Sequence, residues 1–206
     1  ADIAIDPKVL HIRTKQVKAM SRLDFVRGIK VSASRKVLGN YTRAAKSFKD
    51  RGEFGIYVGN AKLIFDLYRP YHGLFGAVRE HWNRFRLSGG LPVGVVSGPA
   101  NALPREWAFA WQVCRAGDED RMNKAQRVVD AFRDRTVAAG GRRTLACLKR
   151  ALYREGVISS ACVAPGTPAL TGVDAERFDQ AFAEVKAIAA REIGEPWLTR
   201  FDGSRS

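Results

Sequence analysis

A lysine in the middle of an apolar, β-branched segment is the residue whose surroundings favour chemistry most clearly. Residues 25–32 read Phe-Val-Arg-Gly-Ile-Lys-Val-Ser, a composition typical of a strand, in which alternation puts Gly28, Lys30 and Ser32 on one face. Because burying an ammonium is costly, a buried lysine tends to lose its proton, and the neutral amine is a nucleophile toward carbonyl groups. Gly28 leaves space beside that amine. The segment therefore predicts a lysine that condenses with carbonyls, or alternatively an edge strand with a solvated lysine.

The cysteines and histidines do not form a pattern that would hold a metal. The three cysteines are widely spaced in apolar contexts, which predicts reduced, buried thiols in a cytoplasmic protein. No two of them have metal-ligand spacing, and the three histidines have no cysteine or carboxylate partner at such spacing. We therefore expect no structural metal. The residues concerned are Cys114, Cys147, Cys162, His11, His72 and His81.

The composition predicts a globular protein with a packed core, since 46% of the residues are hydrophobic and 10% are aromatic. No apolar run approaches the roughly 20 residues that a membrane span needs, and no secretory signal pattern is present. The formal net charge of +14 suggests nucleic acid. However, the basic residues are spread along the chain, arginine outnumbers lysine about two to one, and no aromatic-basic motif accompanies them. We expect neither nucleic acid nor a membrane as partner, and a cytoplasmic location.

Strands and helices alternate up to about residue 104, and helices alone follow. The expected strands are 25–32, 54–59 and 92–98, with helices from about 8 to 20, 34 to 50 and 61 to 68. This alternation predicts an α/β domain with a parallel sheet over residues 1–104, with a helical insertion at about 70–90. Residues 105–206 predict a helical domain, with helices at 104–116, 118–139, 142–154 and 174–193, an extended connector at 157–171 and a disordered tail at 202–206.

Three segments in order resemble the dihydrodipicolinate synthase and N-acetylneuraminate lyase family, the pyruvate-dependent class I aldolases. Residues 26–30 (Val-Arg-Gly-Ile-Lys) are similar to the family's strand with the Schiff-base lysine. Residues 56–60 (Ile-Tyr-Val-Gly-Asn) are similar to the next strand, whose glycine lines the pyruvate site. Residues 94–104 are similar to the last strand and its turn, with the family's Gly-x-x-Ser and Asn-x-x-Pro. The resemblance covers most of the chain except residues 70–90 and the tail.

The resemblance implies a function, a fold and a set of site residues. The implied function is a Schiff-base-forming lyase or aldolase acting on pyruvate or a related 2-oxo acid, with no cofactor. The implied fold is a partial (β/α)8 TIM barrel, its strands six to eight, followed by a C-terminal helical domain. The implied assembly is a homo-oligomer, a tetramer or a dimer. The implied residues are the catalytic Lys30 and the substrate-binding Gly59, Val96, Ser97 and Gly98.

The chain also departs from the family's pattern. The segments for strands one to five are absent, together with the paired hydroxyl residues that hold the pyruvate carboxylate and the tyrosine that shuttles protons. We therefore expect the chain to be the C-terminal part of a longer protein and to be inactive alone. Val31-Ser32 and Ala61-Lys62 stand where the family often has acidic or polar residues, which argues against sialic acid as substrate. The alternative is a non-catalytic or degenerate α/β member that acts as an interaction module.

Overall fold

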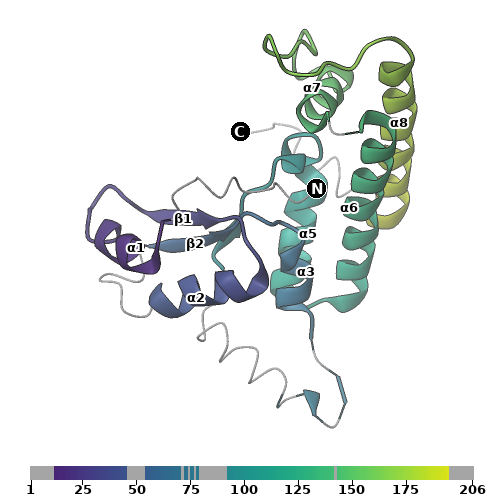
Figure 1. Cartoon of the computed structure of the whole chain (residues 1–206). Helices are drawn as coiled ribbons and strands as arrows, with labels where there is room; N and C mark the ends of the chain where they lie inside the picture. The colour runs from purple at the N-terminus through teal and green to yellow at the C-terminus, as the bar shows by residue number, and fades with distance from the viewer. Residues whose placement is uncertain are drawn as a thin grey trace, which may run out of the picture. The chain divides into compact units, whose positions relative to one another are not determined.

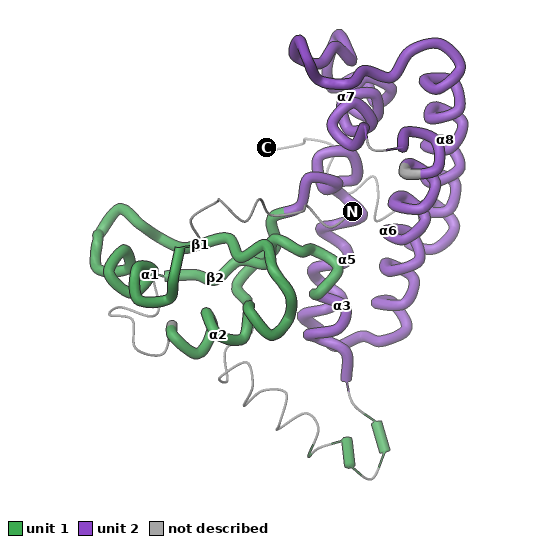
Figure 2. The backbone as a smooth tube through the Cα atoms, in the orientation of Figure 1, with its two compact units in different colours: residues 1–63, 71–96 green, residues 64–70, 97–206 purple. Residues whose placement is uncertain are grey.

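The computed structural model describes residues 12–45, 54–70, 72–73, 75–76, 78, 92–141 and 143–194. The chain divides into two compact units (Figure 2): unit 1 comprises residues 1–63 and 71–96, and unit 2 comprises residues 64–70 and 97–206. The division falls after residue 96 rather than at the expected residue 104. Across the described ranges, no helix is both long and apolar enough to cross a membrane.

Unit 1 contains a parallel sheet of three strands, which confirms the expected combination of helices with parallel strands (Figure 1). The strands are β1 (Gly28–Val31), β2 (Gly55–Val58) and β3 (Gly94–Val95), in the order β1-β2-β3. In the register, Lys30 lies opposite Tyr57, and Tyr57 lies opposite Gly94. All three strands are shorter than expected. Apolar composition indicates roughly where a strand lies, but the ends of the strand depend on which backbone groups pair with the neighbouring strand.

The helices of unit 1 cover one face of this sheet. Helix α2 (Arg35–Ala45) contacts β2, and α1 (Thr14–Met20) lies beside α2, where the Tyr41 hydroxyl donates a hydrogen bond to the Ile12 carbonyl. Figure 1 shows α2 alongside β1 and β2. The buried side chains alternate along the strands, as one covered sheet face requires. They are Val17, Val31, Leu38, Ile56 and Val58.

Unit 2 is helical, as the sequence after Pro104 predicts. Its elements include nearly all of α3 (Leu63–Tyr68), η1 (Pro99–Asn101), α5 (Pro104–Ala116), α6 (Glu119–Gly140), α7 (Thr144–Arg154) and α8 (Gly172–Ile193). Pro104 occupies the first turn of α5, and Gly117, with φ +70°, ends that helix in the left-handed conformation. Residues 157–171 contain neither helix nor strand, in agreement with the expected connector.

Helices α6 and α8 lie side by side and antiparallel in unit 2 (Figure 1). Arg127 pairs with Glu192 and Arg135 pairs with Glu184, so the helices run in opposite directions. Between them the Phe132 ring meets the Phe182 ring edge-on at 6.3 Å. This contact forms part of the core of the unit.

Helix α3 belongs to unit 2 although its neighbours in sequence are strands of unit 1. Arg69, just after α3, donates hydrogen bonds to Glu119, Asn123 and Gln126 on α6. The Tyr68 ring meets the Trp111 ring on α5 at 5.6 Å. These contacts place residues 64–70 with the helices, a long-range effect that local sequence does not predict. The start of the first expected helix, most of the insertion at 70–90 and the tail lie outside the described residues.

Candidate functional site

The site begins with the sheet face that α2 does not cover, which we call the open face. The register and the alternation of side chains assign it Gly28, Lys30, Gly55, Tyr57, Gly94 and Val96. Lys30 is exposed, Tyr57 is 37% exposed and Val96 is 43% exposed. In the described chain, the open face therefore combines an amine, a phenol ring and three glycines.

The three glycines of the open face make room for the Tyr57 ring. A methyl group at Gly28, Gly94 or Gly55 would lie 2.8, 2.9 or 3.0 Å from an atom of that ring. Gly28 and Gly55 come two residues before the level of Lys30 and Tyr57. The ring therefore leans toward the amino ends of the strands.

The Lys30 side chain leans in the opposite direction, toward the carboxyl ends of the strands. A methyl group at Gly59, just beyond β2, would lie 2.8 Å from Lys30 Cε and would overlap Ser32 Oγ. The end of the lysine side chain and the serine hydroxyl are thus neighbours around the space that Gly59 leaves empty. Functional sites of parallel α/β sheets lie at this end of the strands.

The expected burial of Lys30 is wrong for the described chain. Its side chain is exposed because α2 covers the other face of the sheet, where Val31 and Ile56 are buried. The alternative of a solvated lysine at the edge of a sheet therefore describes its surroundings better. The position over Gly59 is nevertheless specific, because a side chain at that position would displace the lysine.

Sequence reasoning placed Ser32 on the face of Lys30 but did not count it as a site residue. The signal was present in the period-two alternation, because Ser32 follows Lys30 by two positions. Tyr57, by contrast, is close to Lys30 in the backbone register but not in the position of its side chain. It lies directly across from Lys30, yet its ring points to the other end of the strands, so its phenol is not the polar neighbour of the amine.

Gly59 and Val96 contribute space and shape to the open face. The Gly59 N–H donates to the Val31 carbonyl and the Val96 N–H donates to the Val58 carbonyl, both at 2.9 Å. Because the sheet already uses these two amides, neither is a donor for a ligand.

Ser97 and Gly98 belong to unit 2, where Gly98 caps the short helix η1. The Gly98 carbonyl accepts two hydrogen bonds of 3.0 Å from Asn101, one from its backbone N–H and one from its side-chain amide. These contacts are those of a tight turn.

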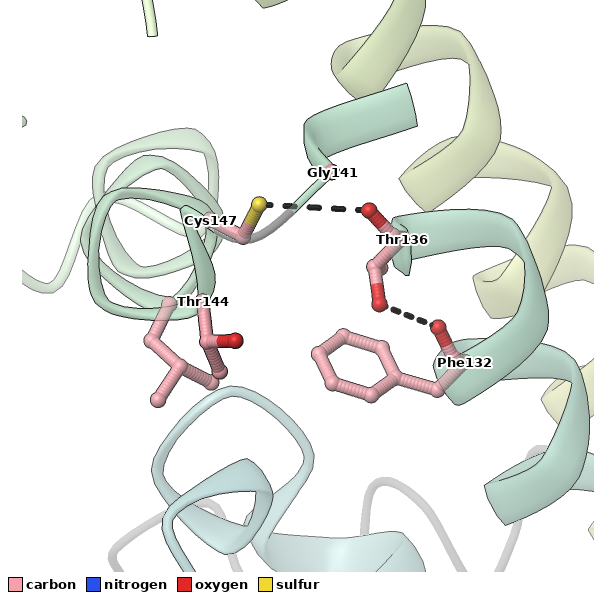
Figure 3. Close-up of a pocket in the computed structure, with 6 residues that line it drawn as sticks. Phe132, Thr136, Gly141, Thr144 and Cys147 are labelled. Carbon is pink, nitrogen blue, oxygen red and sulfur yellow. Dashed lines mark hydrogen bonds between the residues drawn. The ribbon is translucent and has the colours of Figure 1, made fainter. Parts of the chain in front are cut away.

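A separate cavity of about 30 Å³ lies in unit 2 between α6 and α7 (Figure 3). Such a volume holds about one water molecule and no metabolite. The Cys147 thiol points across it toward the Thr136 carbonyl (Figure 3) and donates a long hydrogen bond of 3.9 Å. Burial raises the pKa of Cys147, against the opposing effect of the Arg143 guanidinium. The thiol is therefore a poor nucleophile.

The other cysteines differ in exposure. Burial raises the pKa of Cys114 to about 12, whereas Cys162 is exposed, which corrects the expectation that all three are buried. The described residues contain no group of three or more His, Cys, Asp or Glu side chains that could hold a metal ion.

Comparison with known proteins does not assign a function to these residues. No protein-family model and no curated protein matches the chain. The case for a function therefore rests on the residues and their arrangement.

Proposed function

We propose that Lys30 forms a Schiff base with pyruvate or a related 2-oxo acid, in a class I aldolase or lyase. One observation carries the proposal: the end of the Lys30 side chain lies over Gly59, beside Ser32, at the carboxyl ends of parallel strands. A primary amine over a glycine leaves room for a flat carbonyl compound, and an exposed amine is accessible to it.

The proposed chemistry needs no cofactor. The Lys30 nitrogen adds to the ketone carbon, and the carbinolamine loses water to give an iminium ion. The iminium draws electrons from the neighbouring carbon, which loses a proton to give an enamine and then forms a bond to an acceptor carbonyl; the reverse sequence cleaves that bond. Water finally releases the product and regenerates the amine. The Ser32 hydroxyl is placed to hydrogen-bond to the carboxylate or the carbinolamine oxygen.

The same proposal includes the larger architecture that the resemblance implies. Strands that follow one another in sequence and in the sheet, with the lysine on the face opposite α2, are what part of a (β/α)8 barrel requires. In such a barrel Lys30 points inward. A cytoplasmic homo-oligomer, a tetramer or a dimer, belongs to this proposal.

Borohydride trapping tests the chemistry directly. The complete protein is purified and incubated with pyruvate and sodium borohydride, and peptide mass spectrometry locates any secondary amine. We expect the adduct at Lys30 and its loss in Lys30→Arg, because a guanidinium does not form the iminium. The matched control is Lys36→Arg, which changes an exposed lysine of α2 and should leave trapping intact. An adduct spread evenly over surface lysines, or none, contradicts the proposal.

The second candidate is a non-catalytic α/β interaction module, and the exposure of Lys30 favours it. An amine without a covered pocket lacks the exclusion of water on which such chemistry depends. Under this alternative, pyruvate leaves no specific adduct, while the protein still binds a partner through unit 1.

A further inference from the structure

The Lys30 side chain can extend in two directions along the sheet. A side chain on a strand leans along it, so the lysine can extend back over Gly28 or forward toward Ser32, the residues two positions away on the same face. It extends forward, with Cε beside the position of a Gly59 methyl group. The proposed Schiff base forms from this forward position, so whatever excludes the backward position matters for the chemistry.

The Tyr57 ring occupies the backward position. A methyl group at Gly28, on the lysine's own strand, would lie 2.8 Å from Tyr57 Cε2. A methyl group at Gly55, the diagonal neighbour on β2, would lie 3.0 Å from the same atom and 3.4 Å from Tyr57 Cζ. The Gly55 carbonyl oxygen, 2.5 Å from the Gly28 methyl position, blocks the level nearest the backbone. Carbon atoms that are not bonded pack at about 3.5–4.0 Å, so the lysine methylenes cannot enter the space beside this ring.

The ring fits this position because the strands on both sides carry glycine. The methyl positions of Gly28 on β1 and Gly94 on β3 are 2.8 and 2.9 Å from ring carbons on opposite edges, Cε2 and Cε1. A side chain at either position would move the ring. Because ring carbons make these close approaches, the hydroxyl group is not part of the fit.

We infer that Tyr57 is a positioning residue for Lys30: its ring fills the space behind the lysine and thereby directs the amine toward Gly59 and Ser32. The inference rests on the proposed function, since the amine is the group that condenses with the 2-oxo acid. Tyr57 acts through the lysine, because its ring points to the amino ends of the strands. The contacts involved lie within β1, β2 and β3, so the inference applies equally to the sheet as described and to a complete barrel.

NMR of the complete protein with labelled lysine and glycine tests the position of the side chain. Nuclear Overhauser effects from the Lys30 ε protons to the Gly59 α protons report the forward position, and those to the Gly28 α protons report the backward one. We expect forward contacts alone in the wild type and in Tyr57→Phe, which keeps the ring. Tyr57→Ala should weaken the forward contacts and produce backward ones. Tyr57→Leu should act in the same direction if the alanine variant does not fold, since leucine does not reach as far as the ring.

Borohydride trapping with pyruvate then connects the position with the chemistry. When only a fraction of the lysine side chains lies forward, the rate at limiting pyruvate falls with that fraction, and we expect a loss of about tenfold in Tyr57→Ala. Acetylation of Lys30 by an N-hydroxysuccinimide ester should not fall, because the amine stays exposed. Tyr57→Phe should trap pyruvate at the wild-type rate. The matched control is Tyr41→Ala, which removes a tyrosine ring from α2, on the other face of the sheet, and should leave both readouts unchanged.

Three results would overturn the inference. Forward contacts retained in Tyr57→Ala would show that the space at Gly59 alone directs the lysine. Loss of these contacts with an unchanged trapping rate would remove the link to the chemistry. An equal loss in Tyr57→Phe would assign the effect to the hydroxyl group rather than to the ring. If the wild-type protein forms no adduct with pyruvate, the proposed function fails, while the NMR contacts still decide whether Tyr57 positions Lys30.

Discussion

At Lys30, the backbone and the side chain meet different neighbours. The backbone lies across from Tyr57, whereas the side chain extends forward over Gly59. The residue that the amine lies over is therefore Gly59, two positions after Tyr57 and just beyond β2. The hydroxyl beside it is that of Ser32, on the lysine's own strand.

Gly59→Ala should lower the rate of Schiff-base trapping about a hundredfold, because the new methyl group displaces both Lys30 Cε and Ser32 Oγ. The rate of borohydride-trapped adduct at limiting pyruvate measures this. The matched control is Gly94→Ala, whose methyl group meets the Tyr57 ring rather than the lysine. An unchanged rate in Gly59→Ala would show that the amine reacts from another position.

Cys114 should make the stability of the protein depend on pH. Burial raises its pKa from 9.0 to about 12, so the unfolded chain releases this proton at lower pH than the folded one. The stabilisation is fully present below about pH 9 and is lost as pH rises toward 12. Urea unfolding between about pH 8 and pH 10 should show this loss, with a smaller slope for Cys114→Ala. The exposed Cys162→Ala should keep the original slope.

At the scale of elements, a partly buried ion pair fixes α7 against α8. Arg150 donates from Nε and Nη2 to the two carboxylate oxygens of Asp179, at 2.8 and 2.6 Å. The side chains are only 24% and 17% exposed. The carboxylate correspondingly raises the pKa of Arg150. Two parallel hydrogen bonds between charged groups are among the stronger polar contacts in proteins.

Asp179→Asn should destabilise the protein by about 2 kcal/mol, because it leaves the Arg150 guanidinium without its charged partner. Chemical denaturation followed by circular dichroism measures the change. Asp134→Asn removes one of the two carboxylate partners of Arg133, in a pair whose carboxylate is 61% exposed, and it should cost less than about 0.5 kcal/mol. Equal effects of the two substitutions would contradict this account of the α7–α8 contact.

The elements themselves were largely predictable, because their signals are local. Pro104 and Gly117 mark the ends of α5, and the apolar composition of residues 25–32 and 54–59 identifies two strands. The exposure of Lys30 was not predictable in the same way. A strand with one apolar side does not reveal what covers its other side, and that depends on segments far away in the sequence. The alternation did predict which residues accompany the lysine, but not the direction in which its side chain leans.

At the scale of the whole molecule, charge distinguishes the two units more than composition does. Ten cationic side chains and one acidic side chain in the described part of unit 1 repel one another, whereas ion pairs balance unit 2. Net charge of one sign destabilises a compact state. The total charge, which follows directly from the sequence, does not reveal this difference between the units. The contacts of residues 64–70 with the helices could not be predicted from the sequence either.

Salt should therefore slow amide exchange in unit 1 but not in unit 2. From about 0.01 M to about 1 M salt, the Debye length falls from about 30 Å to about 3 Å. We expect amide hydrogen exchange at Ile56 and Val58 to slow as repulsion in unit 1 is screened. Exchange at Phe182 and Val185 should stay constant or quicken, since screening weakens the ion pairs of unit 2. Slower exchange in both units by the same factor would point to a general salt effect instead.

The path of the chain through the two units limits how gene recombination can exchange them. Residues 64–70 belong to unit 2, although the chain before and after them belongs to unit 1. No single recombination point in the gene can therefore separate the units as intact cassettes. A transferred segment starting at Ser97 would leave behind Ile64, Phe65 and Leu67, all of them buried. Evolution must exchange such units together or rebuild one of them.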